Sequence, residues 1–431
     1  MSSVLPFDII AQIIDTVGKN EDTNLLKELA LVSHSFLQIC TKHLFSTVDL
    51  HDAVPKCHIA SSKKGFIKLL KGRPDIVKYI RKLTYKVGHA SDNRLQFSLG
   101  YPIFDNEDHL LSPILPNFLR TISSLSCLTI TSSNLSDLDW NTLDSSLTSA
   151  FLHLMHLPTT NHIDLSYIQN FPLTSLIPSV NLYRFDIFHM GCFLPLEEDG
   201  SPKIPAQLEM VPKIREFHTS ESALLTSLLF HVKRQDGRPA FNFMDLRRLS
   251  ISSAWHNGDD SEDRNIRYLL QDAKLLEKLH LSVELGWSLV GLRDFLSPSA
   301  HSLKVLDLTM PLDRDSVPRL CEELEEMAGH NILEVLSFEV QVDAHETVDV
   351  IGSTIQNVEK VLVKPGWSVL RQVSFKVTIT FCLVSKEDVA RLSQALQSLP
   401  DKYLSHLSKL ESVAFNYSTC VNDAKYKFEF N

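Results

Sequence analysis

Residues 276–310 read LEKLHLSVELGWSLVGLRDFLSPSAHSLKVLDLTM, and this stretch contains one short phrase twice. The phrase has apolar residues at its first, fourth and sixth positions, as in LEKLHL (276–281) and LKVLDL (303–308). Apolar and polar residues alternate over its second half, which is typical of a strand that buries one face. Each copy of the phrase therefore predicts one half-buried strand.

The phrase recurs on both sides of this stretch. Clear copies begin at Leu125, Leu182, Ile214, Leu246, Leu333, Leu370 and Leu410, and weaker copies begin at Phe45, Ile80 and Thr160. One strand pattern that returns at intervals of about 22 to 45 residues indicates a repeat architecture.

Helical patterns lie between the copies. Val317, Leu320 and Leu324 share one helix face, as do apolar residues within 348–362 and within 389–399. Strands that alternate with amphipathic helices predict an α/β fold of the solenoid type, in which each repeat buries the face of its neighbour. A doubly wound α/β sheet is the competing fold. It normally carries a glycine-rich first turn, and the sequence contains none.

The alternation resembles a leucine-rich repeat array, although an irregular one. The usual repeat is ~20–29 residues long, and the Asn or Cys that normally stands at the ninth position of the phrase is missing. The residues found there instead are Ser133, Ile168, Met190, Ala254, Glu284 and Pro311. The resemblance therefore implies a stack of parallel strands without the buried Asn ladder of regular arrays.

The first fifty residues follow a different pattern. Residues 4–50 read VLPFDIIAQIIDTVGKNEDTNLLKELALVSHSFLQICTKHLFSTVDL, with apolar residues at helical spacing over 9–17 and again over 25–40. Pro6 suits a helix start, where its missing N–H costs nothing, and Gly18 with the polar run after it ends the first helix. Two short helices cannot enclose a core of their own, so part of this apolar surface must meet another surface.

This stretch resembles an F-box, the short helical module that docks on the Skp-type adaptor of cullin–RING ubiquitin ligases. The resemblance rests on the order of Leu5-Pro6, Ile9-Ile10, Ile13, Leu25-Leu26, Leu29, Val32-Ser33, Phe36 and Leu44. The chain departs from the family where Phe36 replaces the more usual Trp, and where residues 18–23 form a longer and more charged linker. The resemblance implies adaptor binding by Leu5, Pro6, Ile9, Ile10, Ile13, Leu29, Val32 and Phe36.

Two domains are expected from these patterns: an F-box-like helical module over residues 1–50 and an irregular leucine-rich-repeat-like solenoid over residues 51–431. In this order the chain is similar to fungal-type F-box receptors with degenerate repeat arrays. The alternative is that residues 5–45 form a helical cap on the repeat domain. Exposure distinguishes the two, because a cap buries its apolar stripe within the chain and a docking module leaves it as a patch.

Composition excludes several classes of protein. The formal net charge of −10 argues against a general nucleic-acid binder. The start MSSVLPFD lacks the basic flank and apolar core of a signal peptide, and no apolar stretch approaches the ~20 residues of a membrane span. The seven cysteines form no close pairs and no CxxC motif, which favours a reducing compartment. We therefore expect a protein of the cytoplasm, the nucleus or both, without membrane or nucleic-acid partners.

Patterns for catalysis and metal binding are missing from the sequence. It contains no GxGxxG, GxxxxGK[ST], HExxH or GxSxG motif. His153 and His156 could share a helix face but lack a third ligand, and the acidic run 259–263 lacks the alternating ligands and glycine of a calcium loop. We therefore expect no catalytic residue, no metal and no cofactor.

Residues 56–86 reverse the acidic balance of the chain. Their basic residues are Lys56, Lys63, Lys64, Lys68, Lys71, Arg73, Lys78, Arg81, Lys82 and Lys86. Asp75 is the one acidic residue among them. Two interpretations are open: a contact for an acidic partner, or a solvated helix and strand whose lysines face water.

The phrase also predicts a recognition surface. Residues between its apolar positions face outward from each strand, and stacked strands align them in columns. Mixed charge with few aromatic residues fits the recognition of a peptide or protein better than a lipid pocket. The predicted substrate-binding residues are Arg184, Asp186, Glu216, His218, Arg248, Lys278, His280, Asp307 and Glu339. Ser250, Thr309, Ser337 and Lys376 belong to the same columns.

The resemblance implies that the chain is the substrate-recognition subunit of an SCF-type ubiquitin ligase, without chemistry of its own. Its expected partners are a Skp-type adaptor, the cullin scaffold and an unknown protein substrate. The alternative is a ubiquitin-independent repeat scaffold for protein–protein interaction. A third class, an enzyme of unfamiliar motif, would be indicated by a convergent cluster of titratable residues in one pocket.

Overall fold

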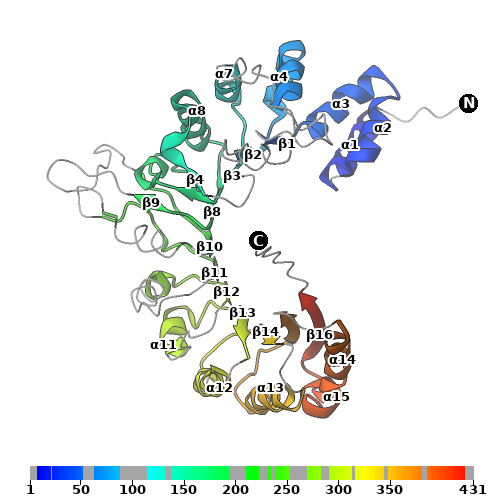
Figure 1. Cartoon of the computed structure of the whole chain (residues 1–431), viewed down its shortest axis with the longest axis vertical. Helices are drawn as coiled ribbons and strands as arrows, with labels where there is room; N and C mark the ends of the chain where they lie inside the picture. The colour runs from blue at the N-terminus through cyan, green and yellow to red at the C-terminus, as the bar shows by residue number, and fades with distance from the viewer. Residues whose placement is uncertain are drawn as a thin grey trace, which may run out of the picture. The chain divides into compact units, whose positions relative to one another are not determined.

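The computed structural model describes residues 7–20, 22–51, 63–87, 114–132, 137–193, 210–220, 222, 229, 232–233, 238–252, 269–282, 291–312, 316–343, 348–380 and 386–422. The chain divides into two compact units. The first comprises Met1–Lys213 and His231–Phe241, and the second comprises Ile214–Phe230 and Asn242–Asn431. In each unit, parallel strands carry helices on one side (Figure 1).

The first unit begins with helices and continues as parallel strands. Its sheet contains β1 (Thr47–His51), β2 (Lys82–Val87), β3 (Cys127–Ser132), β5 (His162–Ser166) and β8 (Arg184–Phe188), paired in that order. Two shorter parallel pairs are β4 (Leu138–Asp139) with β6 (Ile168–Gln169) and β7 (Phe171–Pro172) with β9 (Cys192–Phe193). The helical elements are α1 (Phe7–Lys19), α2 (Thr23–Ala30), α3 (His34–Leu44), α4 (Lys63–Gly72), η2 (Pro74–Tyr79), α7 (Ile114–Thr121), η3 (Trp140–Thr142), α8 (Ser145–Met155) and η4 (Leu173–Leu176).

The second unit repeats the alternation of strand and helix. Its parallel strands, again paired in chain order, are β10 (Glu216–Ser220), β11 (Arg248–Ser252), β12 (Lys278–Ser282), β13 (Val305–Pro311), β14 (Val335–Asp343), β15 (Gln372–Thr380) and β16 (Ala414–Asn422). Its helical elements are α11 (Leu292–Leu296), η5 (Ser297–Ser299), α12 (Ser316–Met327), α13 (Val348–Leu362), α14 (Lys386–Leu396), α15 (Leu399–Tyr403) and η6 (Leu407–Lys409).

The prediction of an α/β fold with parallel strands and intervening helices is confirmed. Every copy of the phrase contains or leads into a strand, and in LEKLHL the three apolar residues Leu276, Leu279 and Leu281 are buried. Among the described strands, each unit keeps chain order and lacks the reversal that defines a doubly wound sheet. The competing fold is therefore wrong.

The last strand lies two residues later than its phrase predicts. The copy that begins at Leu410 would align Val413 with Val373, but Phe415 occupies that register position in β16. The cause is the turn before the strand, where η6 continues into a hydrogen bond from the Val413 amide to the Leu410 carbonyl (3.3 Å). The extra residues of this turn shift the strand without changing its inward and outward faces, because the shift is even.

Aromatic rings occupy the core of each unit. In the second unit Phe338 stacks on Phe375 with ring centroids 4.9 Å apart. The ring centroids of Phe375 and Phe415 lie 6.3 Å apart. In the first unit the ring of Tyr85 meets Phe151 edge to face at 5.0 Å. Such aromatic pairs add about 0.5–1.5 kcal/mol to the stabilisation from buried area.

The helices α1–α3 belong to the same compact unit as β1–β8. The expected domain boundary after residue 50 stays a prediction. Among the helices that the structure describes, none combines the length and the apolar character that a membrane span requires.

Candidate functional site

Three short helices at the start of the described chain share a small core. The fully or almost fully buried side chains at its centre are Ile14, Leu26, Ala30 and Cys40. Asp22 caps α2 by accepting a hydrogen bond from the Leu25 amide (3.0 Å), and Ser33 caps α3 through the Phe36 amide (3.3 Å). The prediction of a single helix over residues 25–40 is therefore wrong, because the Ser33 cap starts a new helix with a new direction.

The same helices leave large apolar side chains in water. The exposed ones are Phe7, Ile9, Ile13, Leu25, Leu31, Val32 and Leu37, and we call them the apolar surface of α1–α3. They are seven of the fourteen large apolar residues that are exposed among the described residues. Leu31 is 88% exposed and Val32 is 65% exposed. A concentration of this kind marks an interaction site more often than an isolated exposed Leu does.

The predicted adaptor-binding residues divide into three groups. Ile9, Ile13 and Val32 lie on the apolar surface. Ile10, Leu29 and Phe36 are half-buried and pack against the small core, so they mainly hold the helices together. Leu5 and Pro6 lie outside the described residues.

Four members of the apolar surface were missed by sequence reasoning. They are Phe7, Leu25, Leu31 and Leu37. The missing information was the rotation of α2, which buries Leu26 and Ala30 and turns Leu25 outward. Ser33 was the available signal in the sequence, because Ser favours the N-cap of a helix. A cap at Ser33 places Leu31 in the short connection between α2 and α3.

In the second unit, the predicted substrate-binding residues lie in register on one face of the strands. Glu216, Arg248 and Lys278 occupy one row across β10, β11 and β12. His218, His280 and Asp307 belong to the next row, with Ser250 and Ser337. Glu339 lies between Thr309 and Lys376 in a further row. Parallel strands in register therefore bring these residues together, as expected from the phrase.

Ion pairs join residues of this strand face, within one row or between two rows. Lys278 Nζ lies 2.9 Å from Asp307 Oδ2, and Lys376 Nζ lies 2.9 Å from Glu339 Oε1. Arg248 Nη1 lies 3.2 Å from Glu216 Oε1. Glu216 and Thr309 are buried, so these two members of the predicted face offer little surface to a partner. The other members are half-buried or exposed.

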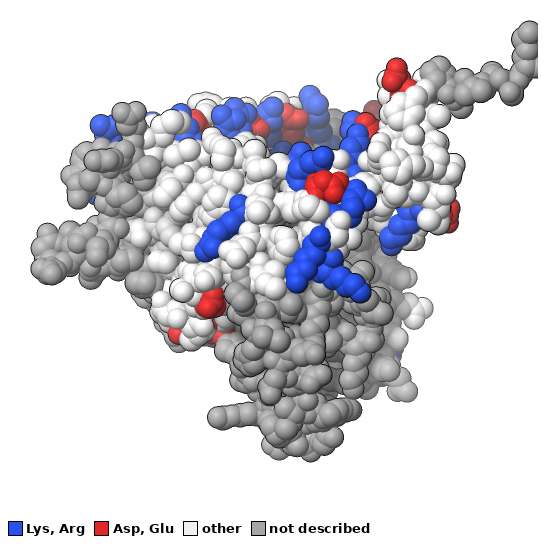
Figure 2. All heavy atoms as spheres, turned by 90° about the horizontal axis from the view of Figure 1, so that it is seen from above, with Lys and Arg blue, Asp and Glu red and all other residues white. Residues whose placement is uncertain are grey.

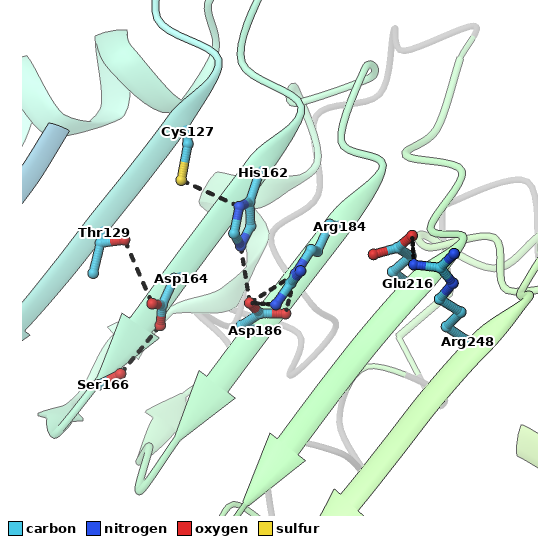
Figure 3. Close-up of polar contacts among 9 residues, drawn as sticks. All are labelled: Cys127, Thr129, His162, Asp164, Ser166, Arg184, Asp186, Glu216 and Arg248. Atoms are coloured by element: carbon cyan, nitrogen blue, oxygen red, sulfur yellow. Dashed lines mark hydrogen bonds and ion pairs between the residues drawn. The ribbon is translucent and has the colours of Figure 1, made fainter. Parts of the chain in front are cut away.

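The first unit carries a denser group on its strands, which we call the polar cluster. Its members are Cys127, Thr129, His162, Asp164, Ser166, Arg184 and Asp186 (Figure 3). Cys127 Sγ lies 3.1 Å from His162 Nδ1, and His162 Nε2 lies 2.9 Å from Asp186 Oδ2. Arg184 Nε donates to both oxygens of Asp186, at 2.9 and 3.0 Å.

Sequence reasoning identified Arg184 and Asp186 but missed Cys127, His162 and Asp164 as members of the polar cluster. A signal was present. When the copies LSCLTI, TNHIDL and LYRFDI are aligned, their third positions are Cys127, His162 and Arg184. The strands pair with these residues in one row.

Burial and hydrogen bonds change the acid–base properties of these groups. Burial acts to lower the pKa of His162, but hydrogen bonds to Asp186 and Cys127 outweigh it and raise that pKa to about 9. Burial, with the charge of Asp186, raises the pKa of Asp164. In the second unit burial lowers the pKa of His280. For Glu339 burial acts upward, but hydrogen bonds from Lys376 and Thr378 leave its pKa below the ordinary value.

Lys82 and Lys86 of the basic stretch belong to β2, whereas its helical elements α4 and η2 lie on the helical side of the first unit (Figure 1). Figure 2 views this side, and Lys and Arg side chains predominate among its charged residues. Two of its arginines have structural partners. Arg73 forms a two-pronged contact with Asp75 at 3.0 Å for each bond, and Arg81 donates to the carbonyls of Lys78 and Ser124. Lys56 lies outside the described residues.

His153 and His156, which are three residues apart in the sequence, do not form a common site. His153 is exposed, whereas His156 Nε2 donates to the Ser175 carbonyl at 2.6 Å. No group of three His, Cys, Asp or Glu side chains within the described ranges could hold a metal ion. The acidic run 259–263 lies outside those ranges. A cavity of ≈ 250 Å³ in the second unit is lined by residues within 293–303 and 327–333, including Leu296, His301 and Met327.

In comparisons with known proteins, no family model matches the chain, and no curated protein is significantly similar to it. Its function therefore has to be inferred from its own residues and contacts.

Proposed function

We propose that the chain is the substrate-recognition subunit of an SCF-type ubiquitin ligase. In this proposal α1–α3 are an F-box that docks a Skp-type adaptor. The strands after them are an irregular leucine-rich-repeat-like array whose strand face holds a target protein. The chain itself then contributes proximity, because it raises the effective concentration of target lysines near the ubiquitin-transfer machinery.

The apolar surface of α1–α3 is the observation that carries this proposal. A helical cap would place its apolar side chains against the rest of the chain, yet Ile13, Leu31 and Val32 are each more than half exposed. Burying one large apolar side chain contributes about 1.5–3 kcal/mol. A partner that covers several of these side chains therefore gains a substantial driving force, and an adaptor is such a partner.

The strand face supports the second half of the proposal. Its charges are already paired within the face, as for Lys278 with Asp307 and Lys376 with Glu339. Exposed pairs of this kind contribute only about 0–1 kcal/mol to stability, so stability gives little reason for so many of them. A face of alternating charge instead suits a protein partner with complementary charges, because such complementarity sets specificity and on-rate.

A ubiquitin-independent scaffold is the second candidate, and one observation favours it. The end of α3 leads directly into the first strand, where Ser46 carbonyl accepts hydrogen bonds from the Arg81 and Lys82 amides, both at 2.8 Å. The helix α3 also packs against η2. Helices that are joined so closely to the first strands can serve as a cap.

Co-purification with a Skp-type adaptor distinguishes the two candidates. The variant Ile13→Asp/Val32→Asp places charges on the apolar surface without touching the small core. We expect a stoichiometric wild-type complex that is weakened by roughly tenfold or more in this variant. Met244→Asp is the matched control, because Met244 is 66% exposed on the second unit, and this variant should bind like the wild type.

Two outcomes contradict the adaptor proposal. One is a folded wild type that forms no complex. The other is a complex that Ile13→Asp/Val32→Asp and Met244→Asp weaken to the same extent. Either result leaves the scaffold as the better description. Circular dichroism of each variant shows whether the fold is retained.

A further inference from the structure

The thiol of Cys127 lies in a row of cationic residues. Lys82, Cys127, His162 and Arg184 are the first residues of four neighbouring parallel strands, and they pair in register. Side chains at one register position of a parallel sheet point to the same face, and neighbouring strands are about 4.8 Å apart. The row therefore places two basic residues and a histidine on the same face as one thiol, and Cys127 itself is half-buried rather than enclosed.

The contacts of His162 connect this thiol to an orienting acid. The carboxylate of Asp186 accepts a hydrogen bond from Nε2 of the His162 ring at 2.9 Å. The other ring nitrogen, Nδ1, lies 3.1 Å from Cys127 Sγ. Arg184 fixes the Asp186 carboxylate through Nε and Nη2. A nucleophile, a base within hydrogen-bond reach and a third group that orients the base are the elements of an activated nucleophile (Figure 3).

We propose that Cys127 is a reactive thiol that forms mixed disulfides with small anionic disulfides. In this step the Cys127 thiolate attacks one sulfur of the disulfide, the S–S bond of the small molecule breaks, and a new S–S bond forms to Cys127. The displaced half leaves as a thiolate and takes the proton held by the His162 imidazolium. The small disulfide is the oxidant in this step: Cys127 is oxidised to the mixed disulfide, and the displaced half is reduced to a thiol.

Charge explains both the reactivity and the choice of partner. The groups that face Cys127 are Lys82 on β2, His162 and Asp164 on β5, and Arg184 and Asp186 on β8. The pKa of His162 is raised to about 9, so its ring is positively charged near neutral pH, as are Lys82 and Arg184. These three positive charges exceed the two negative charges of Asp164 and Asp186, and the balance of the surroundings is positive. A positive environment stabilises a thiolate and attracts a disulfide that carries carboxylates.

Cys40, Cys321 and Cys420 lie in different environments. Cys40 is fully buried in the small core, and burial raises the pKa of its thiol. Burial, with the charges of Glu325 and Glu322, raises the pKa of Cys321 to about 11. Cys420 on β16 is exposed, so it serves as the reference for a thiol that is accessible to reagents.

The test is site-resolved alkylation of the full chain by iodoacetamide, followed by peptide mass spectrometry, over a range of pH. We expect Cys127 to react roughly tenfold faster than Cys420 at about pH 6.5, although Cys420 is more exposed, because the cationic neighbours of Cys127 stabilise the thiolate. His162→Asn should lower the Cys127 rate about tenfold at that pH and much less at about pH 9. Oxidised glutathione, as the disulfide probe, should modify Cys127 first, and Cys127→Ser should remove that product.

A structural role for the Cys127–His162 contact predicts a different result. In that case Cys127 of the wild type reacts more slowly than Cys420 at about pH 6.5. This observation overturns the proposal without a variant that must fold. A Cys127 rate unchanged by His162→Asn at every pH overturns it as well.

Discussion

At the scale of the residue, the buried carboxylate of Glu359 accepts hydrogen bonds from backbone amides at the start of a short helix. Glu359 on α13 is 2% exposed. Its Oε1 accepts hydrogen bonds from the amides of His406 (2.8 Å) and Leu407 (3.0 Å), at the start of η6. Both amides would otherwise lack a partner at this helix start. Glu359 therefore ties α13 to the turn that precedes β16.

His162 makes the stability of the first unit depend on pH. Its pKa is about 9 in the folded chain, above the ordinary value of about 6.5 for an unfolded chain. The protonated ring therefore stabilises the fold fully below about pH 6.5, and this contribution disappears as the pH rises through about 9.

We expect the free energy of unfolding of the wild type to exceed that of His162→Asn by up to about 3 kcal/mol near pH 6, and by much less near pH 9.5. Urea unfolding of both proteins at several pH values measures the difference. Asp186→Asn is the matched control, because it removes the main partner of the ring and should weaken the same pH dependence. A difference that stays constant with pH contradicts this assignment.

The packing of α13 on α15 depends on the absence of one methyl group. A Cβ at Gly352 would lie among the ring atoms of Tyr403. That ring cannot move freely, since its hydroxyl donates to Asp349 Oδ1 (2.7 Å) and Lys402 Nζ lies 4.8 Å from its centre. Gly352 therefore allows α13 and the Tyr403 ring of α15 to pack closely, and its role does not depend on backbone flexibility.

Gly352→Ala sets two effects against each other. Alanine improves helix propensity by about 1 kcal/mol, but overpacking against Tyr403 costs about 1–3 kcal/mol. We expect a net loss of up to about 2 kcal/mol in the free energy of unfolding, measured by urea titration. Gly72→Ala in α4 is the control, because no heavy atom lies within 4 Å of its Cβ position. It should be neutral or slightly stabilising, and a stabilising Gly352→Ala would contradict the packing argument.

At the scale of the whole molecule, the chain repeats one interaction many times. Each strand in the main sheet of a unit pairs with the strand of that sheet that follows it along the chain. Stability in such an array is approximately a sum of terms within each repeat and between nearest neighbours. A defect in one repeat should therefore remain local.

Phe375→Ala tests this locality. Phe375 is buried between Phe338 and Phe415, and loss of a buried Phe side chain costs about 3–5 kcal/mol. Hydrogen exchange followed by mass spectrometry should show faster exchange in β14, β15 and β16, with β1 to β3 unchanged. Equal acceleration in both units would contradict a nearest-neighbour array.

Much of the fold could be predicted from the sequence because strand patterns are local. Alternation of apolar and polar residues with period two identifies a half-buried strand within six residues, and the intervening helices are identified by their own apolar stripes. The copies of the phrase also align the outward residues, so the rows Glu216–Arg248–Lys278 and His218–Ser250–His280 followed from the sequence once parallel pairing was assumed. The shift of β16 did not, because it depends on the turn at η6.

The sequence by itself determined the α/β alternation, the inward and outward faces of the strands and the apolar character of the N-terminal helices. Tertiary structure alone decided which apolar residues of those helices stay in water. Leu25 and Leu26 are chemically equivalent neighbours, and only the rotation of α2 against Ile14 and Cys40 buries one and exposes the other. The contact of Cys127 with His162 was decided in the same way. It joins residues 35 positions apart, and only strand register, which depends on the packing of the whole sheet, brings them within 3.1 Å.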